Sequence, residues 1–130
     1  MIAHVMYFDM DKLYPIVQAE GWGSDNPLVV AYNKIQFPET EDELREAVSS
    51  LIRQGAYRSV ADLYVTGAHE DSALLETVFH DTQNITHSWT HNRSVVKMFG
   101  DDEERSMSVG DLVRMNGGLY VVRRMGFSEV

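Results

Sequence analysis

The chain has 130 residues, of which 44% are hydrophobic and 24% charged, and a formal net charge of −9. This length and composition are typical of one globular domain rather than of a disordered chain. The absence of cysteine excludes disulfides, thiolate metal sites and cysteine nucleophiles. Because phosphate groups and acidic membranes repel an acidic protein, we expect neither membrane binding nor direct nucleic-acid binding.

The N-terminal residues predict a short strand followed by a helix. Residues 2–8 are mostly apolar and β-favouring, and Asp9 ends the run. No positively charged residues precede the apolar run, and Asp9 and Asp11 interrupt it, so we expect no signal peptide and a cytoplasmic location. A helix is expected over residues 11–20, with Pro15 in its first turn, where a missing N–H costs little.

The clearest local signal in the chain is a helix over residues 40–54. Thr40 and Glu43 have the spacing of a capping box, in which each side chain accepts a backbone N–H of the other. Residues 21–27 are expected to form a loop and residues 28–32 a second strand. Within the helix expected over residues 40–54, the apolar residues recur at helical spacing, and they are Leu44, Val48, Leu51 and Ile52.

The second half predicts alternating strands and one more helix. The helix begins at Asp71 or Ser72, which would cap it, and ends near Asn84. Asn116-Gly117 predicts a tight hairpin turn, because both positions of such a turn need positive φ. The expected strands cover residues 57–66, 95–99, 112–115 and 119–125. Together these elements predict one α+β domain over residues 1–130, with a small mixed or antiparallel sheet, barrel-like in one version, and two main helices.

Several residues of the second half carry a family resemblance. They are Asn84, Trp89, the run Arg105-Ser106-Met107-Ser108-Val109-Gly110-Asp111, the segment 118–122, Gly126 and Phe127. On these residues, the part of the chain from about 57 to 130 resembles the YodL-like family of small domains from bacteria, phages and mobile genetic elements. Residues 1–56 have no counterpart in it. The resemblance implies an accessory protein in a bacterial or phage-infected cell, and it implies no catalytic residue.

The run from Arg105 to Asp111 has two interpretations. Gly110-Asp111 before a strand is typical of a turn, and Arg105 has the charge to pair with a carboxylate. Ser106 and Ser108 share one face in an extended segment and can bond a backbone edge. The alternative is a phosphate or peptide pocket made by Arg105 and the serines. We favour the structural interpretation, because short polar runs at turns usually bond the backbone.

Two other patterns have both a catalytic and a structural interpretation. Asp9 and Asp11 have the spacing of a magnesium site in a small metal-dependent hydrolase or phosphotransferase, but a strand end with helix-capping aspartates explains them better. His87 and His91 lie four apart, as metal ligands on a helix do, but their neighbours are poor helix formers. We therefore expect loop histidines, no metal, no cofactor and no enzymatic activity.

The remaining candidates suit protein binding. Trp22, flanked by glycines, is an exposed contact candidate, whereas Trp89 is expected in the core. Glu41, Asp42 and Glu46 either complement the helix dipole or contact a partner. Residues 1–104 contain eighteen of the twenty acids and seven bases. We therefore expect an accessory protein that binds and modulates a host protein with a basic surface, such as a defence or nucleic-acid enzyme; a structural phage component is a further alternative.

Overall fold

The computed structural model describes residues 1–67 and 70–130, and the chain forms two compact units. Unit 1 comprises Met1–Tyr7 and Ser59–Glu129, and unit 2 comprises Phe8–Arg58 with Val130. Unit 2 therefore consists largely of the residues that fall outside the family resemblance. The single domain over residues 1–130 stays a prediction.

Unit 1 is built on an open antiparallel sheet, in the strand order β3-β2-β1-β4-β5-β6. Within the described residues the strands of the sheet are β1 (Ile2–Phe8), β2 (Tyr57–Tyr64), β3 (Val95–Met98), β4 (Leu112–Met115), β5 (Gly118–Val122) and β6 (Phe127–Glu129). The last residue of β1 and the first two of β2 belong to unit 2. Strands β3 and β6 lie at opposite edges, so the barrel-like version is not confirmed. The short strand β6 was not predicted as a separate element, because the sequence pattern extended β5 to residue 125.

The β4–β5 hairpin confirms the local turn prediction. Asn116 has φ of +53° and Gly117 has φ of +78°, and Met115 pairs with Gly118 across the turn. Positive φ at both central residues matches the right-handed twist of the flanking strands. The dipeptide therefore determines the register of this hairpin.

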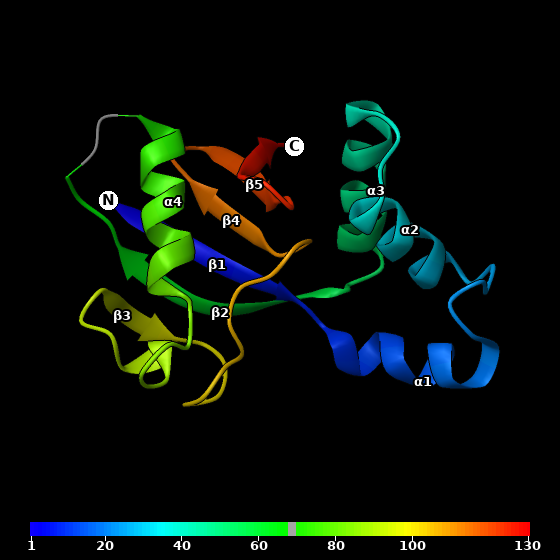
Figure 1. The fold of residues 1–130 in the computed structure, drawn as a ribbon, viewed down its shortest axis with the longest axis horizontal. Helices are drawn as coiled ribbons and strands as arrows, with labels where there is room; N and C mark the ends of the chain where they lie inside the picture. Colours follow the sequence, from blue (N-terminus) through cyan, green and yellow to red (C-terminus); the bar gives the residue numbers. More distant parts are fainter. Residues whose placement is uncertain (68–69) are drawn as a thin grey trace. The chain divides into compact units, whose positions relative to one another are not determined.

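Helix α4 (Asp71–Asp81) lies across the sheet of unit 1, as Figure 1 shows. Its Leu74, Leu75 and Val78 belong to one buried cluster with side chains of β1, β2, β4 and β5. The short 3-10 helix η1 (Trp89–His91) adds Trp89, which is fully buried in the same cluster. The prediction of Trp89 as a core residue is confirmed.

The start of α4 differs from the sequence prediction. Glu70 is the N-cap and makes no side-chain capping bond, so Asp71 is not the cap. The Asp71 carboxylate instead accepts hydrogen bonds from Asn116 Nδ2 (2.9 Å) and Tyr120 Oη (2.7 Å). The hydrogen bond from Tyr120 to Asp71, together with some burial, raises the pKa of Tyr120 to about 12. Asp71 thus connects α4 to the β4–β5 hairpin.

Helix α3 (Glu41–Arg53) of unit 2 follows the predicted helix closely. Thr40 is its N-cap, and its Oγ1 accepts the Glu43 N–H at 3.0 Å. The helix buries Leu44, Ala47, Val48 and Leu51. Ile52, expected on the same face, is 45% exposed. The buried stripe is therefore narrower than the sequence pattern indicated.

Helix α2 (Pro27–Gln36) replaces the strand predicted over residues 28–32. Asn26 caps it by accepting the Leu28 N–H at 2.9 Å, and Pro27 occupies the first turn, where proline is favoured. The residues that it buries have helical spacing, and they are Leu28, Val29, Ala31 and Ile35. A short apolar run fits a strand or a buried helix equally well, so the cap and the later Ile35 decide the structure.

Helix α1 (Met10–Glu20) completes unit 2. Asp9 is its N-cap, and the Asp9 carboxylate accepts the Asp11 N–H at 3.1 Å. Pro15 lies in the second turn rather than the first, contrary to expectation. Four α-helices rather than two main ones thus occur in residues 1–67 and 70–130. None of the helices described there is long and apolar enough to cross a membrane.

Candidate functional site

The residues of the Arg105–Asp111 run come together around an ion pair between Arg105 and the buried Asp111 in unit 1. Arg105 donates to both carboxylate oxygens of Asp111, at 2.6 and 2.8 Å. The Asp111 side chain is 1% exposed and also accepts the Ser108 N–H at 2.8 Å. The guanidinium lies 4.2 Å from the centroid of the Tyr7 ring. A two-pronged bond to a buried carboxylate fixes the orientation of this arginine.

The backbone at Arg105 is held by two aromatic side chains. Trp89 Nε1 donates to the Arg105 carbonyl oxygen at 2.8 Å, and Tyr7 Oη donates to the same oxygen at 2.9 Å. Burial, and then the negative charge of Asp111, raise the pKa of Tyr7 well above its usual range, so its hydroxyl remains a donor. Two core residues therefore position the run.

Asn84 connects the segment before η1 to the same run. Its Nδ2 donates to the Glu104 carbonyl oxygen at 2.9 Å, and its Oδ1 accepts the Trp89 N–H at 2.9 Å. Its own N–H donates to Ser106 Oγ at 2.8 Å. Glu104 is 7% exposed, and its carboxylate accepts the Asp101 N–H. These polar groups bond one another, which favours the structural interpretation of the run over a pocket.

Gly110 has the backbone role that its position before a strand indicated. Its φ is +96°, and its N–H donates to the Val122 carbonyl oxygen at 3.0 Å. The turn at Gly126, with φ of +72°, likewise precedes Phe127, whose ring lies 6.5 Å from that of Phe79. Both glycines thus occupy conformations that other residues rarely adopt.

We expect Gly110→Ala to lower the free energy of unfolding by about 1 kcal/mol or more, because a Cβ at this φ is strained. Ser106→Ala should cost less, since it removes one exposed hydrogen bond. Urea unfolding midpoints of the two variants and the wild type measure this difference. Equal midpoints for Gly110→Ala and the wild type would contradict it.

The protein-binding candidates lie in unit 2 and are exposed. Trp22 is 48% exposed, stacks on the Tyr32 ring at 5.8 Å, and accepts a bond from Asn33 at its carbonyl oxygen. Glu41 and Asp42 lie in the first turn of α3, and Glu46 lies one turn later. The outward indole is therefore held in place by an aromatic neighbour on α2.

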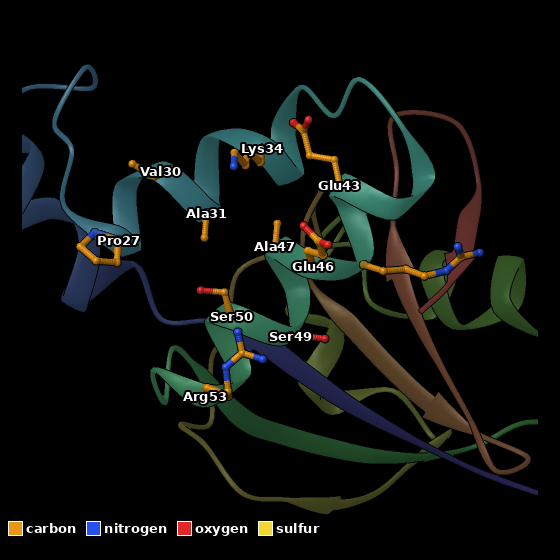
Figure 2. Close-up of a pocket in the computed structure, with 11 residues that line it drawn as sticks. Pro27, Val30, Ala31, Lys34, Glu43, Glu46, Ala47, Ser49, Ser50 and Arg53 are labelled. Atoms are coloured by element: carbon orange, nitrogen blue, oxygen red, sulfur yellow. The ribbon is translucent and has the colours of Figure 1, made fainter.

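A groove of about 620 Å³ is lined by residues of α2 and α3 alone, as Figure 2 shows. Its floor includes the small residues Ala31 and Ala47. Its charged lining residues have both signs, and they are Lys34, Arg45, Arg53, Glu43 and Glu46. Of the acidic candidates, Glu46 borders this groove. The mixed charge does not select a ligand class.

The structure shows other hydrogen bonds for three of the residues considered for metal chemistry, Asp9, Asp11 and His87. Asp9 Oδ1 accepts the Asp11 N–H, as a capping aspartate does. His87 bonds to Asn92 at 3.1 Å, and His91 ends η1, so the two histidines do not share an α-helix. Throughout the described residues, no three His, Asp or Glu side chains are placed to hold a metal ion.

One constellation of side chains was missed by the sequence analysis. His4 Nδ1 lies 2.6 Å from Asp62 Oδ1, and His4 Nε2 lies 2.9 Å from Ser59 Oγ. These residues lie on the neighbouring strands β1 and β2 of unit 1. His4 and Asp62 are separated by 58 positions, so no local spacing could reveal the cluster.

Comparison of the chain with protein-family models, curated proteins and solved structures finds no significant match. The resemblance to the YodL-like family therefore remains a prediction.

Proposed function

We propose that the protein acts by binding and modulating a host protein that presents a basic surface, such as a defence or nucleic-acid enzyme. The setting in phages or mobile genetic elements rests on the family resemblance of residues 57–130. In this proposal the protein acts in the cytoplasm of a bacterial cell, and the contact requires neither a metal nor a cofactor.

The observation that carries the proposal is the division of α3 into two faces. Leu44, Val48 and Leu51 are buried in unit 2, whereas Glu41, Asp42 and Glu46 are exposed. Asp42 contacts Arg45 at 3.2 Å, but this pair is exposed and contributes little to stability. The acids are thus not needed to form the core, and their field would accelerate encounter with a basic partner.

Trp22 supplies the second part of the proposed contact. Tryptophan is enriched among the residues that carry most of the binding energy at protein interfaces. The Tyr32 ring supports the indole of Trp22, and Phe8 lies against Tyr32 at 4.9 Å. A supported aromatic side chain loses little conformational freedom when a partner covers it. The metal-dependent alternative gains no support, because Asp9 is used as a cap.

Changing Glu41, Asp42 and Glu46 together to lysine is expected to slow association with the partner about tenfold at low salt and to flatten the salt dependence. The fold should persist, since Thr40 and Glu43 still form the cap. The partner is first obtained by affinity capture from the bacterial host, and association rates are then measured against ionic strength by biolayer interferometry.

A matched control separates a local contact from net charge. Changing Asp101, Asp102 and Glu103 to lysine reverses three exposed acids of unit 1 and alters the net charge equally. The proposal expects a smaller effect from this control. Equal effects of the two triple variants would refute the α3 contact. So would an association rate that changes neither with salt concentration nor in the α3 triple variant, and the search for the contact would then turn to Trp22.

A further inference from the structure

The Ser59, His4 and Asp62 side chains form a hydrogen-bonded chain on the sheet of unit 1. A carboxylate can only accept, so the short contact to Asp62 requires His4 Nδ1 to carry the proton. The neutral ring then has a free electron pair on Nε2, 2.9 Å from Ser59 Oγ. In this tautomer the serine hydroxyl donates to the imidazole. This is the order of contacts in serine nucleophiles activated by a histidine.

Ser59 and Asp62 both contact His4, although they lie three positions apart in β2. Residues three apart in a regular strand point to opposite faces. Here the two residues between them, Val60 and Ala61, are both fully buried, so Ser59 and Asp62 both reach His4. The pairing of β2 with β3 is also irregular, because its register shifts between Asp62 and Leu63. Bulges often redirect a side chain at functional sites.

The surroundings leave the serine accessible and add an apolar contact and a cation. Ser59 is exposed, whereas the His4 and Asp62 side chains are 26% and 24% exposed. The Phe99 ring lies edge-on to His4 at 5.3 Å and is itself half exposed. Lys97, the register partner of Asp62, places its Nζ 4.7 Å from the Phe99 centroid. An ester could thus lie on Phe99 with a positive charge nearby.

We propose that Ser59 is a nucleophile for acyl transfer from small carboxylic esters, with His4 as general base and Asp62 as a positioning residue. Ser59 Oγ attacks the carbonyl carbon while its proton passes to His4 Nε2. The ester C–O bond then breaks, and the leaving alcohol takes that proton. Water, deprotonated by His4, cleaves the acyl-serine to give the carboxylic acid and restores Ser59. This activity lies in unit 1, and it is independent of the binding function proposed for unit 2.

The first test uses the unmodified protein and a fluorophosphonate ester. Ser59 Oγ would form a bond to phosphorus as fluoride leaves, which adds a stable mass that peptide mapping locates. The internal reference is Ser49, which is exposed on α3. Among the described residues, no histidine is hydrogen-bonded to it. We expect Ser59 to be labelled about 100-fold faster than Ser49, the gain typical of a positioned general base. Equal rates, or no adduct on Ser59, would overturn the proposal.

Variants assign the roles within the site. His4→Gln and Asp62→Asn should each slow Ser59 labelling at least about tenfold. For hydrolysis of 4-nitrophenyl acetate, Asp62→Asn should lower kcat more than it changes KM. His80→Gln is the matched control, because His80 also contacts an aspartate, Asp81, at 3.4 Å. Unchanged labelling in Asp62→Asn, or an equal loss in His80→Gln, would refute the assigned roles; circular dichroism verifies that each variant is folded.

Discussion

Replacing Asp111 with alanine is expected to lower the free energy of unfolding by about 1–3 kcal/mol. Arg105 would lose a carboxylate that accepts two of its N–H groups, and the Ser108 N–H would lose its acceptor as well. The Arg105 side chain is 35% exposed, so water can solvate its charge once Asp111 is removed. The cost therefore comes mainly from the buried Ser108 N–H contact and from the lost orientation of the guanidinium. The site of the change is the segment that enters β4, so the hairpin should be affected too.

Urea unfolding followed by tryptophan fluorescence measures this effect in unit 1. The chain has two tryptophans, so a Trp22→Phe background leaves Trp89 as the reporter. Asp42→Ala is the control, because it breaks an exposed ion pair and should change the free energy of unfolding by less than about 1 kcal/mol. A similar midpoint for Asp111→Ala and Asp42→Ala would contradict the structural role of the Arg105–Asp111 pair.

Replacing Trp89 with alanine should lower the free energy of unfolding by about 3–5 kcal/mol. Trp89 is fully buried, packs with the cluster beneath α4, and donates to the Arg105 carbonyl oxygen. The variant leaves a large cavity, and the Arg105 carbonyl oxygen keeps only the hydrogen bond from Tyr7 Oη. Trp89→Phe keeps most of the apolar surface and loses the indole N–H, so it should cost less.

Far-UV circular dichroism during urea unfolding measures both Trp89 variants, since fluorescence loses its main reporter. Trp22→Ala provides the comparison within the same chain, because its indole is half exposed in unit 2. We expect the Trp89→Ala effect to exceed the Trp22→Ala effect by at least about 2 kcal/mol. Equal effects would show that Trp89 does not anchor the core of unit 1.

The elements predicted well depend on residues close together in the sequence. Thr40 and Glu43 form the cap of α3, and Asn116-Gly117 forms the hairpin turn. Capping and turn geometry are set within a few residues, so the sequence alone determines them. The strand predicted over 28–32 failed for a related reason. Its apolar residues fit the period of a strand and that of a helix, and the helix cap at Asn26 was the stronger signal.

The candidate site was predictable only in part. The exposure of Trp22 and of the acids of α3 was expected from their glycine and charge context, and the structure agrees. The pairing of Arg105 with a carboxylate was also expected, but not that its carbonyl oxygen would accept bonds from Tyr7 and Trp89. Those two residues lie 98 and 16 positions from Arg105.

The sequence by itself determined the caps of α1 and α3, the hairpin turn, the glycine at the entry to β4 and the acidic face of α3. Only the tertiary structure decided that the sheet stays open and that Ser59 and Asp62 meet His4. Strand order and bulges depend on hydrogen bonds between segments that are distant in the chain, and these bonds leave no fixed spacing in the sequence. Local chemistry therefore determined the elements, and nonlocal pairing determined which side chains share a site.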